Sequence, residues 1–123
     1  MAGKTKRGKA GKATTKKSLQ KPKGLKKQYL KTKPLCRVTF RLPREAAPDA
    51  RSVVIVGDFN NWDRKATPLK HLKNGDWTVT INLERGRQYQ YRYLIDDHIW
   101  ENDWFADQYV PSPFGSDNSV VSV

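Results

Sequence analysis

The sequence predicts an all-β protein, an antiparallel β-sandwich that carries a basic N-terminal tail. Two observations predict the sandwich: short stretches in which apolar and polar residues alternate, and turn signals that separate them about every ten residues. A third observation sets the tail apart. Residues 1–33 hold 13 of the 24 Lys and Arg residues and no acid, so the net charge of +12 belongs to this segment.

The tail, residues 1–33, is predicted to be disordered. It is rich in Lys, Gly, Ser and Thr, and such a segment buries too little apolar surface to offset the entropy lost on ordering. The spacing of Leu25, Tyr29 and Leu30 also fits a short helix near the boundary. One sandwich domain is expected over residues 34–123.

The first two strands of the body are predicted at residues 37–42 and 53–56. The first alternates apolar and polar residues, as a strand with one buried face requires. A loop at 46–50 follows it. The second is a continuous β-branched run, typical of a central strand covered on both faces. The turn at 57–63 then uses Gly, Asp and Asn, which tolerate left-handed backbone.

The next strand is predicted at residues 77–83, after the turn signal Asn74-Gly75. Trp77 falls in line with the apolar residues of this strand, so we expect it in the core.

A further strand is predicted at residues 88–95, after a second turn. Its tyrosines occupy every second position and so share one face, which places Arg92 on the opposite face. An acidic loop at 96–107 follows, and the closing strands are predicted at 109–110 and 120–123.

Three tryptophans lie where strand alternation assigns them no place in a core. Trp62 follows Asn61 in a polar turn, and Trp100 and Trp104 lie in the acidic loop. Aromatic rings that stack on the apolar face of a pyranose, with charged and amide groups at the hydroxyl rim, bind sugars. Structural alternatives stay open: Trp62 as a cap of the sandwich, Trp104 as a packing residue, and Arg92 as a solvated strand residue.

Three blocks of the sequence resemble one known family. These blocks are 57–62, 89–96 and 114–121, and they resemble the family 48 carbohydrate-binding module over about residues 37–123. That module is the glycogen-binding domain of AMP-activated protein kinase beta subunits and the early-set domain that precedes the catalytic barrel of isoamylases and branching enzymes. The resemblance implies an immunoglobulin-like, early-set sandwich that binds α-glucan, such as glycogen, starch or malto-oligosaccharide.

The resemblance also implies which residues form the site. The glucan-stacking pair falls on Trp62 and Trp100, and Arg92 stands where the kinase module usually has Lys. Trp104 competes with Trp100 for the stacking role, and we favour Trp100; Asn118 could also serve only as a turn former. The implied carbohydrate-binding residues are Trp62, Arg92, Trp100, Phe114, Ser116 and Asn118, with Asn61 and Trp104 as secondary candidates.

The chain is not expected to be an enzyme, because it ends at Val123 with no catalytic barrel and its carboxylates crowd into one loop. Because Cys36 is the single cysteine of the sequence, an intrachain disulfide and a multi-cysteine metal site are excluded, and we expect Cys36 to be buried or idle. His71 and His98 are isolated, so we expect surface positions, no metal site and no cofactor. The crowded carboxylates, interpreted as a surface charge run, are Asp96, Asp97, Glu101, Asp103 and Asp107.

Two other functions stay open beside the binding of α-glucan. The segment Lys4–Lys33 is expected to bind nucleic acid or another polyanion by counterion release, or to act as a solvated tether. Alternatively, the early-set fold docks on a partner enzyme or kinase-like subunit, which the sequence does not identify. There is no apolar run of about 20 residues and no secretory signal, so we expect no membrane span and a cytoplasmic location.

Overall fold

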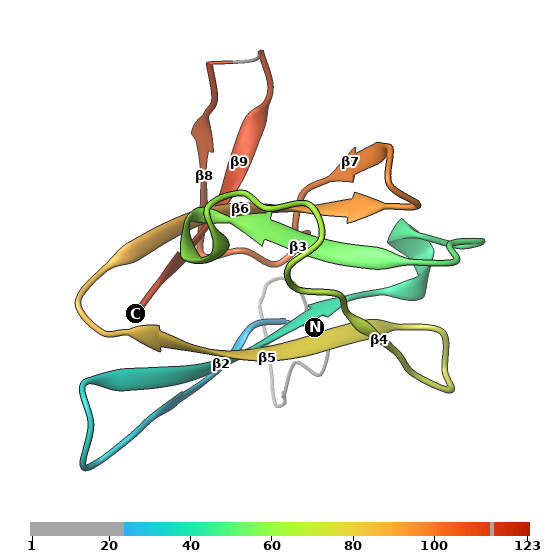
Figure 1. The fold of residues 1–123 in the computed structure, drawn as a ribbon. Coiled ribbons are helices and arrows are strands. Elements are labelled where there is room, and N and C mark those ends of the chain that lie inside the picture. Colours follow the sequence, from blue (N-terminus) through green and yellow to red (C-terminus); the bar gives the residue numbers. More distant parts are fainter. Residues whose placement is uncertain (1–23, 114) are drawn as a thin grey trace, which may run out of the picture.

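The computed structural model describes residues 24–113 and 115–123, and the remaining tail residues and Phe114 lie outside them. Two antiparallel sheets pack face to face as a sandwich, which confirms the predicted fold class (Figure 1). Sheet A has the strand order β1–β2–β5–β4, and sheet B has the order β3–β6–β9–β8, with β7 paired to β6. The strands are β1 (Lys26–Tyr29), β2 (Leu35–Leu42), β3 (Val53–Gly57), β4 (Lys70–His71), β5 (Trp77–Glu84), β6 (Gln88–Ile95), β7 (Ile99–Glu101), β8 (Gln108–Pro111) and β9 (Asp117–Ser122).

Sheet A is centred on β2 and β5, which pair along their whole length. Val38 and Phe40 of β2 are fully buried, whereas Thr39 lies on the outer face, as the period-two pattern predicts. Trp77 of β5 is in the core, as predicted, and is 4% exposed. Cys36 is also buried in this core.

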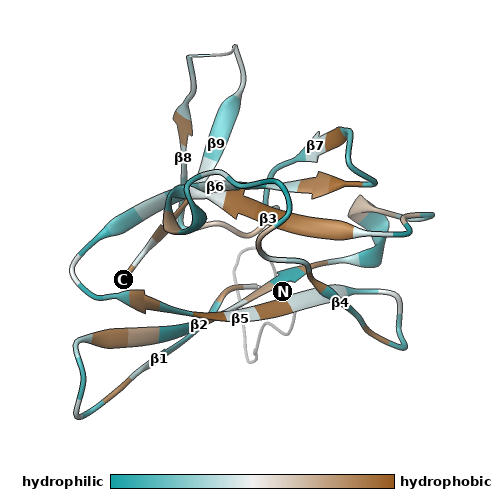
Figure 2. Ribbon diagram, viewed as in Figure 1, coloured by the Kyte–Doolittle hydropathy of each residue, from teal (hydrophilic) through white to brown (hydrophobic). Residues whose placement is uncertain are grey.

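Sheet B is centred on β6, which pairs with β3, β7 and β9. Every residue of β3 is buried, as its β-branched run predicts, and Figure 2 shows this strand as a continuous hydrophobic band. Tyr91 and Tyr93 of β6 are fully buried against the facing sheet. The rings of Tyr91 and Phe40 pack edge to face, with 5.1 Å between their centroids. Alternation therefore turns Gln90 and Arg92 to the outer face of sheet B.

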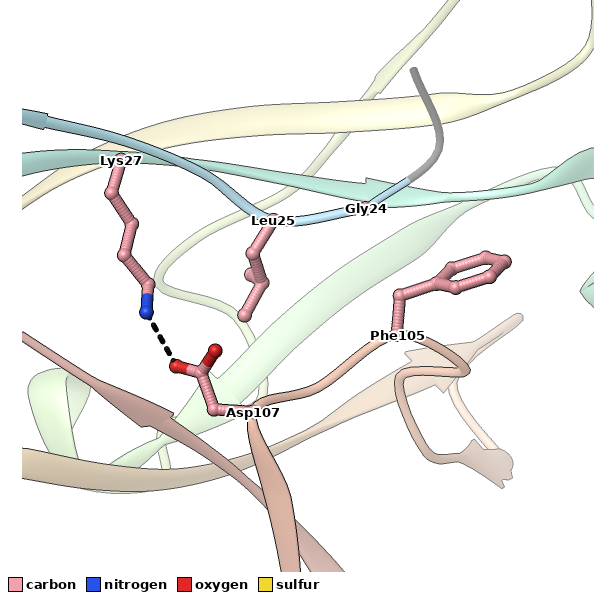
Figure 3. A pocket seen from close by; sticks show the side chains of 5 residues that line it. All are labelled: Gly24, Leu25, Lys27, Phe105 and Asp107. Carbon is pink, nitrogen blue, oxygen red and sulfur yellow. Dashed lines mark hydrogen bonds and ion pairs between the residues drawn. The ribbon is translucent and has the colours of Figure 1, made fainter. Parts of the chain in front are cut away.

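The sequence interpretation of the tail boundary is wrong on one point, because residues 26–29 form a strand and not a helix. β1 pairs antiparallel with β2, while Leu25 packs against the core. The Lys27 ammonium lies 2.7 Å from a carboxylate oxygen of Asp107, so an ion pair links β1 to the segment that leads into β8 (Figure 3). The sandwich thus begins about eight residues earlier than the predicted boundary.

Two further strands were not predicted. β4 is only two residues long and pairs with β5, where the exposed His71 ring stacks on Trp77 at 4.0 Å. β7 lies within the segment that the sequence assigned to an acidic loop. The turn from β6 to β7 has positive φ at Asp96 and Asp97, the feature of a type I′ hairpin turn.

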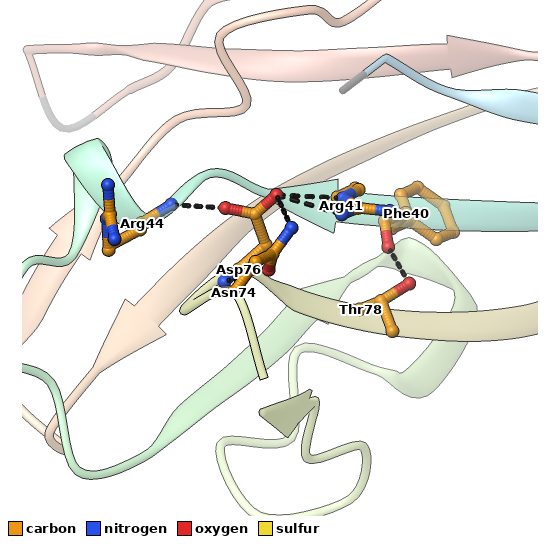
Figure 4. A network of polar contacts seen from close by, with 6 residues as sticks. All are labelled: Phe40, Arg41, Arg44, Asn74, Asp76 and Thr78. Carbon is orange, nitrogen blue, oxygen red and sulfur yellow. Dashed lines mark hydrogen bonds and ion pairs between the residues drawn. The ribbon is translucent and has the colours of Figure 1, made fainter. Parts of the chain in front are cut away.

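One buried carboxylate fixes the end of sheet A next to the β2–β3 connection (Figure 4). Asp76 is 4% exposed, and it accepts a hydrogen bond from the Arg44 backbone N–H at 2.8 Å. The Arg41 guanidinium lies 3.0 Å from the other carboxylate oxygen, so the charge of Asp76 is paired. Of the helices in the described residues, none is long and apolar enough to cross a membrane.

Candidate functional site

An open groove of about 610 Å³ lies on the outer face of sheet B. It brings together five of the predicted site residues, from the turn after β3, from β6, β7 and β9, and from the β8–β9 loop. Asn61 and Trp104 are not among its lining residues, and Phe114 lies outside the described residues. The lining residues are Asp58, Trp62, Gln90, Arg92, Trp100, Pro113, Ser116 and Asn118.

Trp62 forms one wall of the groove and also packs on the sheet beneath it. Val54, Val56 and Leu94 make a small buried cluster on this face, and Trp62 packs against it. Trp62 therefore packs on the outer face of sheet B and lines the groove at the same time. Its φ is 56°, and such a left-handed backbone costs a bulky residue about 1–3 kcal/mol. Strain of this kind persists only where the surroundings hold it.

The turn that carries Trp62 is held by the residues on either side of it. The 3-10 turn η2 (Asp58–Asn60) follows β3, and Asn61 ends it in the left-handed conformation with a φ of 58°. The Asp58 carboxylate accepts the indole N–H of Trp62 at 2.9 Å and the backbone N–H of Gln90 at 2.8 Å. A side chain at Gly57 would bring its Cβ within 2.5 Å of the Gln90 carbonyl oxygen, so the close approach to β6 requires glycine there.

Trp100 and Trp104 differ in their place although both are exposed. Trp100 lies on β7 opposite Leu94 and lines the groove, and its side chain is 40% exposed. Trp104 is 46% exposed and donates its indole N–H to Glu101 at 3.1 Å, away from the groove. The guanidinium of Arg64 stands 5.5 Å from the centroid of the Trp100 ring, and Arg64 does not line the groove.

Arg92 forms the floor of the groove, where it is fixed by neutral partners. Its Nε donates to the side-chain oxygen of Asn118 at 2.6 Å, and one terminal nitrogen donates to Ser116 at 2.6 Å. The Asn118 amide nitrogen in turn donates to Gln90 at 3.0 Å. No acidic side chain contacts Arg92 within the described residues. The guanidinium is therefore held in place with its charge uncompensated by direct pairing.

A buried carboxylate behind the groove anchors the segment between β7 and β8. Asp103 is 1% exposed, and its side chain accepts the Tyr91 hydroxyl at 2.6 Å and the Tyr93 hydroxyl at 3.3 Å. Burial raises the pKa of Asp103, and burial beside this carboxylate raises the pKa of both tyrosines. The backbone N–H of Asp103 donates to the hydroxyl oxygen of Ser119 on β9 at 2.9 Å. The network joins β6, β9 and the segment after β7.

The interpretation of the five loop carboxylates as a surface charge run is wrong for Asp103, which lies in this interior network. Two others have structural partners. Asp96 accepts the backbone N–H groups of Arg51 and Ser52, and these hydrogen bonds lower its pKa. Asp107 pairs with Lys27, as described above.

Sequence reasoning missed Asp58, Gln90 and Pro113 as groove residues. For Gln90 a signal existed, because it shares the outer face of its strand with Arg92. Asp58 carried no such signal, since its contacts come from a turn folded back onto β6. Pro113 becomes part of the groove through the β8–β9 loop.

Most of the sandwich matches a known protein family. Residues 37–110 match carbohydrate-binding module 48, described as the isoamylase N-terminal domain. The match includes Trp62, Arg92 and Trp100, and it ends before Ser116 and Asn118.

Among curated proteins, the chain is similar to branching enzymes. It is 42% identical over 52 residues to the 1,4-alpha-glucan branching enzyme GlgB of Nitrobacter winogradskyi, which covers 42% of this chain and 7% of that enzyme. It is 44% identical over 43 residues to the 1,4-alpha-glucan-branching enzyme of Emericella nidulans, covering 35% of this chain and 6% of that enzyme. The chain therefore spans only a small part of the length of these relatives.

Among solved structures, the fold is similar to part of the enterobactin esterase FES from Shigella flexneri in the presence of enterobactin. The TM-score is 0.63 at 11% identity, and the match covers 82% of this chain and 33% of the esterase. At this identity the likeness concerns the fold alone.

Proposed function

Because the chain belongs to the carbohydrate-binding module 48 family, we propose that it binds an α-glucan in the groove of sheet B and does not cut it. The observation that supports the proposal is the pairing of two indole rings, Trp62 and Trp100, in the lining of one groove. Such rings stack on the apolar faces of glucose units. The names of the branching-enzyme relatives favour a 1,4-linked α-glucan as the ligand class.

The polar groups of the groove suit a neutral polyhydroxylated ligand. Arg92 supplies guanidinium donors, and the side chains of Gln90, Ser116 and Asn118 supply both donors and acceptors. Because these groups already hold one another in place, a sugar meets an arranged set of partners and little side-chain entropy is lost on binding.

Binding without cleavage is supported by the single carboxylate in the groove. Glycoside hydrolysis commonly uses two carboxyl groups on opposite sides of the scissile bond. Among the residues that the structure describes, Asp58 is the one carboxylate that lines the groove, and its two oxygens accept hydrogen bonds from Trp62 and Gln90. A carboxylate engaged in this way is suited to hold the turn and not to transfer a proton.

The test compares two tryptophans of one segment. Trp100→Ala removes a ring from the groove, whereas Trp104→Ala removes a ring of similar exposure outside it. We expect Trp100→Ala to weaken co-sedimentation with glycogen about tenfold or more, because a lost stacking contact is worth about 1.5 kcal/mol. Trp104→Ala should bind like the parent.

Two outcomes would contradict the proposal. In one, the parent chain does not co-sediment with glycogen or amylose. In the other, Trp100→Ala and Trp104→Ala bind equally well. The first result would favour the alternative in which the early-set fold docks on another protein and has no sugar ligand.

A further inference from the structure

The outer face of sheet A has a composition unlike that of the groove. Because residues opposite each other in antiparallel strands share a face, the strand register identifies the side chains that point away from the core. Buried Val38 and Phe40 fix the inner face of β2, so Arg37, Thr39 and Arg41 lie on the outer face.

Rows of side chains run across this outer face, and three successive rows form its basic part, while Leu35 and Glu84 form the row beyond them. Each of the three rows contains at least one cation and at least one hydroxyl or amide group, and none of the three contains an acid or a large apolar residue. The rows are Gln28, Arg37 and Asn82; then Lys26, Thr39 and Thr80; then Arg41, Thr78 and Lys70.

Three of the four cations on this face have no carboxylate in contact within the described residues. Arg41 is paired with Asp76, whereas Lys26, Arg37 and Lys70 are exposed and unpaired. The neighbouring acid, Glu84 at the end of β5, lies 3.0 Å from Arg87 and is thereby paired. The face therefore carries a net positive charge across its four strands.

We propose that this face is a binding surface for the phosphate backbone of double-stranded nucleic acid. Lys and Arg side chains neutralise phosphates, and the hydroxyl and amide groups between them are the other side chains that donate to phosphate oxygens. Successive rows are about 6.8 Å apart along the strands, so several phosphates can be contacted at once. The contacts are to the backbone, and binding is independent of base sequence.

The composition of the face favours a duplex over two other polyanions. Single strands are held largely by aromatic rings that stack on bases, and no aromatic residue belongs to the three rows. Stable attachment to an anionic lipid surface needs inserted apolar side chains as well as cations, and the rows contain none.

The surface is adjacent to the most basic part of the sequence. Lys26 lies on β1, and residues 1–25, which precede it, hold nine further Lys and Arg residues and no acid. Lys31 and Lys33 lie in the exposed β1–β2 connection beside the same sheet. The cations of the sheet and those of the preceding sequence thus have the same sign, which favours a polyanion as the ligand.

The test removes three charges from the face and, in a control, three charges elsewhere. The first variant of the full chain carries Lys26→Gln, Arg37→Gln and Lys70→Gln. The control carries Arg51→Gln, Lys65→Gln and Lys73→Gln, which remove the same charge from exposed positions outside the three rows. Binding to a short mixed-sequence DNA duplex is followed by fluorescence anisotropy over a series of salt concentrations.

We expect the slope of log K against log salt concentration to fall in magnitude by about 2–3 in the face variant, because each lost phosphate contact contributes about 0.9. The control should keep the slope of the parent, and a second duplex of different sequence should bind equally. Thermal unfolding and glycogen binding of both variants establish that the fold is intact.

Equal loss of slope in the two triple variants would overturn the proposal, because net charge alone would then explain the binding. So would a face variant that loses binding to phosphatidylserine vesicles while it keeps the duplex affinity of the parent. In that case the face would serve a membrane.

Discussion

The two outer faces of the sandwich follow the same strand alternation and differ in what lies over them. On sheet B, the turn after β3, the β7 strand and the β8–β9 loop surround the face, and a groove of about 610 Å³ forms. On sheet A, most of the outward side chains of β1, β2, β5 and β4 are hydroxyl, amide and cationic groups. Strand alternation thus decides which residues face outward, while the turns decide whether an outward face becomes hollow.

The faces also differ in how they hold charge. Arg92 on sheet B is fixed by neutral acceptors within a ring-lined groove. Arg37 on sheet A is exposed among neutral polar neighbours. A fixed guanidinium between aromatic walls suits directional hydrogen bonds to a neutral sugar, whereas exposed cations suit diffuse attraction to phosphates.

The strongest changes in binding are expected from two matched substitutions, one on each outer face. Arg92→Gln should weaken glycogen binding about tenfold, since one charge-assisted hydrogen bond is worth about 1.5 kcal/mol, and it should leave duplex binding unchanged. Arg37→Gln should leave glycogen binding unchanged and lower the salt slope of duplex binding by about 1. Co-sedimentation and anisotropy of both variants check this. If both substitutions weakened both ligands, the separation of the faces would fail.

A second prediction concerns two carboxylates of the groove scaffold, one buried and one exposed. Burial raises the pKa of Asp103 above its ordinary value of 3.8, so the native state binds this proton more readily than the unfolded chain does. The contribution of Asp103 to stability therefore falls as pH rises through the interval between the two pKa values. Asp103→Asn should remove this fall, and urea unfolding at a series of pH values measures it.

Asp96 should show the opposite sign. Backbone hydrogen bonds from Arg51 and Ser52 lower its pKa below 3.8, so its contribution is present above that pH and is lost as pH falls through the native pKa. Asp96→Asn should be less stable than the parent at neutral pH and equal to it in strong acid. A parallel pH dependence for the Asp96 and Asp103 variants would contradict the assignment of one to the interior and one to a surface turn.

The smallest effect is expected at Arg64. Its guanidinium stands over the Trp100 ring at 5.5 Å without lining the groove, so we expect it to steady the ring. Arg64→Gln should weaken glycogen binding about threefold, because an exposed cation–π contact is worth about 0.5–1 kcal/mol. The matched control is Lys65→Gln. Tighter binding by Arg64→Gln would instead mean that the guanidinium competes with sugar for the ring.

Local sequence patterns predicted most of the strands of the fold. The alternation in β2, β5 and β6 and the β-branched run of β3 predicted these strands and the inward tyrosines. The helix expected around Leu25 and Tyr29 was wrong. The segment forms the four-residue strand β1, and so few residues do not let local spacing decide between helix and strand. Pairing with β2, together with the contact from Lys27 to Asp107, favours the strand, and both contacts are nonlocal.

The candidate site was predictable in part. The strand pattern turned Arg92 outward, and the family resemblance suggested the aromatic pair. The burial of Asp103 was not predictable from local sequence. It depends on the hydroxyl groups of Tyr91 and Tyr93, which reach Asp103 from another strand. The role of Asp58 was likewise set by a turn folded onto β6, which no local periodicity records.

Binding of α-glucan in the groove is best tested by co-sedimentation of the unaltered chain with glycogen at low salt and at ~0.5 M salt, where the Debye length is only a few ångströms. If the groove binds α-glucan by ring stacking and fixed hydrogen bonds, the fraction that co-sediments should be the same in both conditions, while duplex binding should fall steeply. Glycogen binding that falls in parallel with duplex binding would contradict the account, because the basic residues and not the groove would then hold the polysaccharide.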